Sequence, residues 1–200
     1  MKHSLRFLPF LVSLLLVSCI GIDADITVGA DGAVDVSMRY TVSLALDELG
    51  KLGANAGYLP MPVGQADLEL AATRAGGALR SWSRKDGSEA TVITAALRFP
   101  TASAFALFLD PRGETAVFTE LDGKSRLRID LYKGTNAADA DLIEFIKTAF
   151  SDYIVSIRME LPRTPTANGG FLVSGRTASF SMKAADLYSR ATPVSIDVSW

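Results

Sequence analysis

Apolar and polar residues alternate after residue 21, as expected for strands with one buried face. Apolar side chains take every second position of the segments 22–28 and 34–44, and Asp, Ser, Thr or Arg fills the positions between them. Asp31 and Gly32 lie between the two segments, and an Asp-Gly pair flanked by alternating runs favours a β-hairpin turn. The pattern predicts an antiparallel hairpin with an apolar face toward the core and a polar face toward solvent.

The same signals predict two more hairpins further along the chain. Their strands and Asp-Gly turns are Ala78–Lys85, Asp86-Gly87 and Glu89–Phe99, then Glu114–Leu121, Asp122-Gly123 and Lys124–Tyr132. The segments between the hairpins differ in length and composition, so we interpret the three turns as shared turn chemistry and not as an internal repeat. Further strands are predicted over 154–161, 176–182 and 194–200, with a loop over 162–170.

Helical periodicity appears in several segments between the strands. The predicted helices are Leu44–Gly53, Gln65–Ala75, 101–109 with Thr101 as its N-cap, and Asp139–Tyr153, followed by a helical turn at Ala184–Tyr188. No low-complexity linker separates these elements. The sequence therefore predicts one α+β domain, with a mainly antiparallel twisted sheet built from hairpins and three to four helices on one face.

Residues 1–18 have the organisation of an export signal. A short basic start precedes the apolar run 7–17, which is shorter than the roughly 20 residues that a membrane-spanning helix needs. The adjoining Leu16–Cys19 resembles the lipobox of bacterial lipoproteins, which implies cleavage before Cys19 and attachment of diacylglycerol to its thiol. The alternative interpretations are an ordinary signal peptide with an incidental cysteine, or a buried first helix.

The lipobox resemblance predicts a cleaved signal peptide over residues 1–18 and a single lipid-anchored domain over residues 19–200. Two or more acyl chains hold a protein stably on a bilayer, whereas one chain holds it only marginally. No later run of the sequence approaches spanning length. We therefore expect the domain to lie on the exported side of the inner or outer membrane of a bacterial cell envelope.

The composition of the chain excludes most of the common catalytic, metal-binding and redox sites. The chain has 20 Lys and Arg against 22 Asp and Glu, a formal charge of −2, which disfavours a nucleic-acid partner. Its one His, His3, leaves with the signal peptide, and its one Cys carries the lipid. A Ser-His-Asp triad, a Cys-His pair, His-ligated zinc and a CxxC redox pair are thereby excluded. With no P-loop or GxGxxG motif either, the sequence predicts a non-enzymatic protein without cofactor or metal site.

Short motifs along the mature chain resemble the LppM-like family of exported bacterial lipoproteins. After Cys19 they are the Asp-rich alternation with Asp31-Gly32, Phe99-Pro100-Thr101, Phe105 with Leu107-Phe108-Leu109, Arg128–Leu131, Leu161-Pro162, Asn168-Gly169 and Gly175-Arg176-Thr177. Where the family often has a Trp, this chain has Ala178-Ser179-Phe180. The resemblance implies a membrane-tethered α+β domain, with lipid or glycolipid binding expected in some members and no catalytic residues.

Two apolar segments are candidates to line a ligand cavity between the sheet and the helices. Their residues are Tyr58, Leu59, Met61, Phe105, Phe108 and Leu109. Pro60 and Pro62 exclude a helix around Met61, and the resulting apolar loop is harder to explain than an apolar helix stripe. The alternative is that all six side chains complete the core.

Arg80, Trp82 and Arg84 alternate along one predicted strand and would share one face of it. We predict this face as an interaction surface for lipid phosphates or a protein partner, with Trp82 stacking on a cation or entering an interface. The segment 124–128 carries a similar row of three cations. For both rows the alternative is the solvated outer face of a sheet, where charge protects an edge.

Two groups of carboxylates raise the possibility of a metal or carboxylate-pair site. The residues are Asp23, Asp25, Asp31 and Asp35, and separately Asp139 with Asp141. The first group lacks the closing Glu and internal Gly spacing of a calcium loop. The second group is better explained as helix N-terminal charge.

The leading hypothesis is a membrane-anchored lipoprotein that acts as a non-enzymatic binding module for a lipid or other amphiphile. The alternative is a protein-interaction or assembly lipoprotein of the cell envelope that docks an envelope partner on the Trp82 face or on an edge strand. A third hypothesis is a carboxylate-dependent hydrolase of envelope polymers that uses the aspartates named above.

Overall fold

The computed structural model describes residues 20–44, 64–88, 90–133, 144 and 153–200. Seven strands form one sheet, which we call the large sheet. From edge to edge its strands are β3 (Ala78–Asp86), β4 (Ala90–Phe99), β2 (Val34–Ser43), β1 (Ile20–Val28), β7 (Ile154–Glu160), β10 (Thr177–Lys183) and β9 (Leu172–Ser174). A four-stranded small sheet contains β5 (Ala116–Leu121), β6 (Lys124–Tyr132), β11 (Val194–Ser199) and β8 (Thr166–Asn168). The helices with described bounds are α3 (Gln65–Arg74), α4 (Ala102–Leu109) and α6 (Ala184–Tyr188).

The strand pairs predicted around the Asp-Gly turns are present. β1 pairs with β2, β3 with β4 and β5 with β6, all antiparallel. At the first turn the Asp31 carboxylate accepts a hydrogen bond from the Ala33 amide at 3.1 Å, and Gly32 has φ +81°. Glycine adopts this left-handed conformation without steric cost, which explains why the turn forms at this pair.

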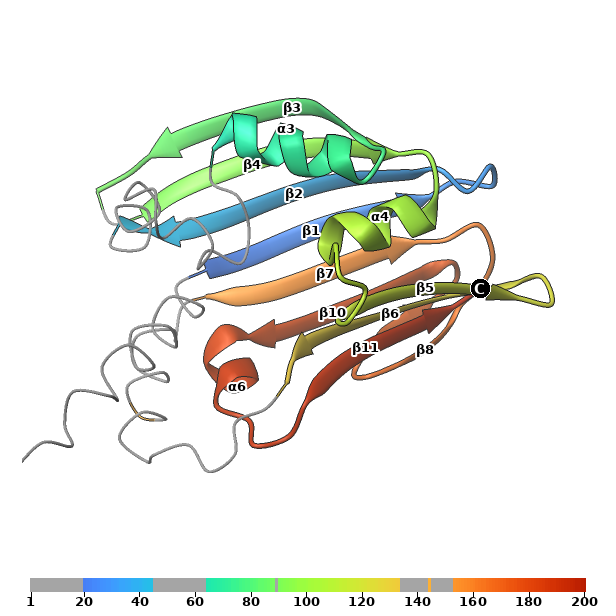
Figure 1. The fold of residues 1–200 in the computed structure, drawn as a ribbon. Coiled ribbons are helices and arrows are strands. Elements are labelled where there is room, and N and C mark those ends of the chain that lie inside the picture. The colour runs from blue at the N-terminus through green and yellow to red at the C-terminus, as the bar shows by residue number, and fades with distance from the viewer. Residues whose placement is uncertain (1–19, 45–63, 89, 134–143, 145–152) are drawn as a thin grey trace, which may run out of the picture.

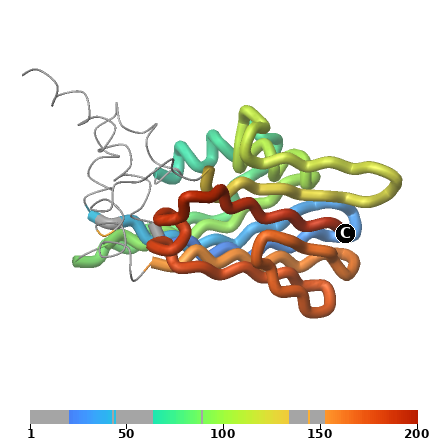
Figure 2. Tube along the Cα trace, turned by 90° about the horizontal axis from the view of Figure 1, so that it is seen from below, coloured from blue at the N-terminus to red at the C-terminus, as the bar shows by residue number. Residues whose placement is uncertain are grey.

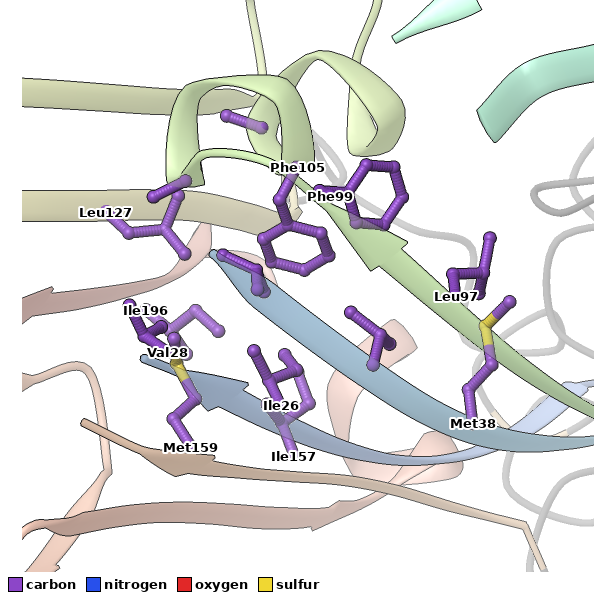
Figure 3. Close-up of a cluster of buried hydrophobic side chains, with 14 of the residues drawn as sticks. Ile26, Val28, Met38, Leu97, Phe99, Phe105, Leu127, Ile157, Met159 and Ile196 are labelled. Carbon is purple, nitrogen blue, oxygen red and sulfur yellow. The ribbon is translucent and has the colours of Figure 1, made fainter. Parts of the chain in front are cut away.

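One face of the large sheet is covered and the other is open to solvent. α3, α4 and the small sheet all lie on the covered face (Figures 1 and 2). A single core fills the space between the layers: Leu127 and Ile196 of the small sheet, and Phe105 of α4, meet apolar side chains of the large sheet (Figure 3). The open face carries the polar residues of the alternating pattern, such as Asp25 and Ser37, which are exposed.

The α+β class and the mostly antiparallel strand pairing are confirmed, but the architecture differs from the predicted single sheet. Part of the cover over the large sheet is a second sheet and not helices. β1 and β7 pair in parallel, with Ile26 opposite Met159. The region predicted as loop contains β8, and β9 follows it directly. The predicted helices Leu44–Gly53 and Asp139–Tyr153 fall almost entirely outside the described residues.

Asp110 ties the end of α4 to the start of β5. Its side chain is only 9% exposed, and its carboxylate accepts hydrogen bonds from the amides of Arg112 at 2.9 Å and Glu114 at 2.6 Å. The amide and hydroxyl of Thr115 donate to the same carboxylate. These bonds, first that from the Thr115 amide and then that from Arg112, hold the pKa of Asp110 well below its usual range.

Asp110→Asn is expected to lower the free energy of unfolding by about 2 kcal/mol at pH 7, because an amide is a weaker acceptor than a carboxylate for several amide donors. The pKa of Asp110 is lowered in the folded state, so its stabilisation is present above about pH 4 and is lost as the pH falls further. The difference between wild type and variant should therefore shrink in urea unfolding at pH 3. Asp122→Asn, at an exposed turn, is the control and should change little. An Asp110→Asn cost that does not depend on pH would contradict this role.

Candidate functional site

A pocket of about 450 Å³ opens on the uncovered face of the large sheet, where β1 and β7 begin. We call it the outer-face pocket. Its lining residues are Gly21, Ile22, Asp23, Arg39, Thr41, Tyr153, Ile154, Ser156 and Ser181. The volume is within the range of about 300–1,000 Å³ that small-molecule sites occupy.

Strand register brings these residues together. In one row across the sheet, Asp23 of β1 lies opposite Arg39 of β2 and beside Ser156 of β7, and Ser156 lies opposite Ser181 of β10. In the next row, Gly21 lies opposite Thr41. Residues two apart on a strand point to the same face, so both rows direct their side chains outward. The pocket therefore combines hydroxyl groups with one carboxylate and one guanidinium.

Gly21 leaves the floor of the pocket open. A Cβ at this position would lie 3.2 Å from the ring atom Cδ1 of Tyr153 and 3.6 Å from the carbonyl oxygen of Ile154. A glycine inside a strand often marks a place where a ligand or another chain segment comes close to the backbone. Tyr153 is half-buried and Ile154 is 50% exposed, so they add an apolar wall to the polar rows.

Two ion pairs lie on this face outside the pocket, whereas the two charged residues of its lining form none among the described residues. On the same face, Arg98 contacts Asp35 at 2.9 Å and Arg176 contacts Glu160 at 3.3 Å. Among the described residues, no ion pair involves Arg39 or Asp23. Both side chains are exposed and available to a bound group.

The predicted apolar ligand residues are divided between the core and undescribed segments. Tyr58, Leu59 and Met61 lie outside the described residues. Phe105 is 2% exposed, and the Phe105 and Phe108 rings pack on Phe99 with centroid distances of 5.6 and 5.1 Å. Leu109 is 38% exposed at the end of α4. The structure thus places the two phenylalanines in core packing, and a ligand role for the six residues stays a prediction.

Arg80, Trp82 and Arg84 do not form one solvent-facing row. The β3–β4 register shifts between Leu79 and Ser81, so Arg80 lies at an irregularity of the strand and is exposed. Trp82 is half-buried and packs against the hydrophobic core, and its buried indole nitrogen has no hydrogen-bond partner among the described residues. Arg84 donates to Asp86 at 2.8 Å. The side of β3 that carries Trp82 faces the core, so the predicted solvent-facing row is not formed, and a role of the three residues in an interaction surface stays a prediction.

The other charged rows are also engaged in local pairs. Arg126 binds Asp197, and Arg128 donates to Asp130 at 3.0 Å. The bond to Arg126 lowers the pKa of Asp197. Asp139 and Asp141 lie outside the described residues. Within the described ranges no three His, Cys, Asp or Glu side chains gather as metal ligands, and no helix there is long and apolar enough to cross a membrane.

The sequence pattern does not predict the outer-face pocket. It indicates Asp23 only as a metal or catalytic carboxylate, and it does not connect Asp23 with any residue of β7 or β10. Their proximity depends on the parallel β1–β7 pairing, which local patterns do not reveal. One residue of the sequence does point to this place. Gly21 lies inside the first strand, and a glycine there often marks a place where a ligand or another segment comes close to the backbone.

The described elements define an α+β domain in which a seven-stranded and a four-stranded sheet, mostly antiparallel, enclose one core. The folded domain of LppM from Mycobacterium tuberculosis, solved by NMR, has a similar fold, with a TM-score of 0.52 over 92% of this chain and 90% of that one. The two sequences are 11% identical, so the likeness concerns the fold alone. No protein-family model and no curated protein sequence matches the chain.

Proposed function

We propose that the protein is a bacterial lipoprotein, anchored through Cys19 to the inner or outer membrane, whose exported domain is a non-enzymatic binding module for a lipid or other amphiphile. The signal-like segment before Cys19 supports the anchor. The LppM-like fold is compatible with such a module and by itself says nothing about a ligand.

The outer-face pocket is the observation that carries the binding proposal. An amphiphile has a polar head and an apolar part, and the lining offers partners for both. Arg39 and Asp23 are exposed and unpaired among the described residues, and three lining hydroxyls lie beside them. Ile154 and the ring of Tyr153 supply apolar contact at the same place. Pockets of this kind use a few convergent polar groups for orientation and apolar walls for affinity.

A binding role fits this lining better than the other two hypotheses do. Hydrolysis by a carboxylate pair uses two carboxyl groups, and the described lining holds one, that of Asp23. Asp23 and Asp25 are exposed on neighbouring rows of the solvated face of the large sheet. The protein-partner hypothesis uses the Trp82 face or an edge strand, and of these two surfaces the Trp82 side packs against the core.

Mass spectrometry of an organic extract of the full protein, purified from its membrane, tests the proposal. We expect a co-purifying amphiphile at near-stoichiometric amounts. Gly21→Val should reduce it about tenfold, because the valine methyl groups fill the pocket floor. Arg39→Ala, which leaves the floor unchanged, should reduce a ligand with an anionic head to a similar extent.

Ser37→Val is the matched control, since Ser37 is exposed on the same face outside the lining. All variants are first compared by circular dichroism to exclude misfolding. Retention of the wild-type amount of amphiphile by both pocket variants would refute the proposed site. An extract without any amphiphile would refute the proposed ligand class.

A further inference from the structure

The first strand starts one residue after the proposed lipid attachment site. β1 begins at Ile20, directly after Cys19. Consecutive Cα atoms are about 3.8 Å apart, so no linker separates a lipidated Cys19 from the sheet. We call the end of the large sheet where β1 and β7 begin and β2 and β10 finish the anchor end. In Figure 1 it lies opposite the β1–β2 turn and the chain's C-terminus.

Charge on the open face of the large sheet is polarised along the strands. Two rows at the anchor end carry three cations, Lys85, Arg39 and Lys183, against one carboxylate, Asp23. The next two rows carry Arg98 and Arg158 against Asp25, Asp35 and Glu160, and Arg176 pairs with Glu160, so the charges there balance. The surplus of positive charge therefore lies at the anchor end.

Two of the exposed apolar side chains lie at the same end. Ile154 is 50% exposed at the start of β7, and Leu44 is 37% exposed directly after β2. Tyr153 precedes Ile154 and lines the outer-face pocket with it. Cations next to aliphatic and aromatic side chains are the combination that binds the interface of an anionic bilayer.

We propose that the anchor end of the large sheet docks on the anionic phospholipid bilayer that holds the lipid anchor. Arg39, Lys85 and Lys183 face the lipid phosphates, and Ile154 enters the headgroup layer. The outer-face pocket then opens at the bilayer surface, and its occupant is the headgroup of a phospholipid from that membrane. This inference rests on the proposed anchor at Cys19 and adds an orientation and a ligand class to it.

Site-specific quenching tests the orientation on the full lipidated chain. Cys19 is the only cysteine, and its thiol is consumed by the lipid, so one added cysteine can be labelled alone. Ile154→Cys places a fluorophore at the anchor end. Ala30→Cys places it beyond β1, about 25–30 Å away at ~3.3 Å per residue. In phosphatidylglycerol vesicles with a spin label at the headgroup, quenching at position 154 should exceed that at position 30 several-fold.

A second set of variants tests whether docking depends on the cations at the anchor end. Lys85→Ala with Lys183→Ala should reduce quenching at position 154 by at least half, as should replacement of phosphatidylglycerol by phosphatidylcholine. Arg112→Ala with Lys124→Ala, two exposed cations outside the large sheet, is the control and should leave quenching unchanged. Equal reduction by both pairs would overturn the role of Lys85 and Lys183.

Flotation of the same vesicles separates the two levels of the proposal. If the labelled protein does not float with vesicles, the anchor itself is refuted. If it floats but positions 154 and 30 are quenched equally, the anchor stands and the docking orientation is overturned. Quenching confined to position 154 supports both.

Discussion

Replacement of Cys19 by alanine is expected to release the protein almost completely from membranes. The proposed thioether-linked diacylglycerol would be lost with the thiol, and its acyl chains would contribute about 0.8 kcal/mol for each buried CH₂ group. Surface contacts of the anchor end are much weaker, because each exposed cation near an anionic bilayer contributes about 1 kcal/mol.

Metabolic labelling with palmitate and membrane flotation measure this effect. The wild type should incorporate label and float, whereas Cys19→Ala should do neither. Ser18→Ala is the control, since it keeps a small residue before the cysteine and should behave as wild type. If the Cys19→Ala protein floats with membranes to the same extent as the wild type, and the wild type incorporates no palmitate, the lipoprotein proposal is refuted.

Phe105→Ala should have the largest effect on stability among the predicted ligand residues that the structure describes, which are Phe105, Phe108 and Leu109. Phe105 is 2% exposed, and its ring packs on Phe99 at 5.6 Å. Removing a buried phenylalanine ring loses its transfer free energy and leaves a cavity, so the free energy of unfolding should fall by about 3–4 kcal/mol. Urea unfolding measures the change.

Leu107→Ala is the matched control, because Leu107 belongs to the same helix but is 48% exposed. Its cost should stay below about 1 kcal/mol. The comparison also distinguishes a core role of Phe105 from a ligand role. A Phe105→Ala variant with normal stability but less bound amphiphile would show that the ring contacts ligand.

Local signals in the sequence predicted the strands that are adjacent in the chain. The Asp-Gly turns and period-two alternation identified β1–β2, β3–β4 and β5–β6, because both signals depend only on neighbouring residues. Thr101 was correctly placed as the N-cap of α4, where its hydroxyl accepts from the Ala104 amide at 3.1 Å. These interactions form within a few residues and leave a direct trace in the sequence.

Long-range pairing left no such trace. The division into two sheets and the parallel β1–β7 pair join segments far apart in the chain. β8 and β9 are three residues long, too short to show alternation. The outer-face pocket was missed for the same reason, since Asp23 meets Ser156 only through the β1–β7 register. At Trp82 the alternation correctly predicts a strand, but the structure turns this side chain toward the core and not toward solvent.

The short strands at the sheet edges affect whether copies of the protein on one membrane pair with each other through these edges. β9 closes one side of the large sheet and β8 one side of the small sheet, each with three residues. Long unpaired borders recruit identical chains into extended fibrils, and the irregularity at Arg80 interrupts the β3 border as well. Tethering in two dimensions raises the encounter frequency between neighbours. At the two edges formed by β8 and β9, the short strands would limit side-by-side polymerisation of copies held, as proposed, on one bilayer.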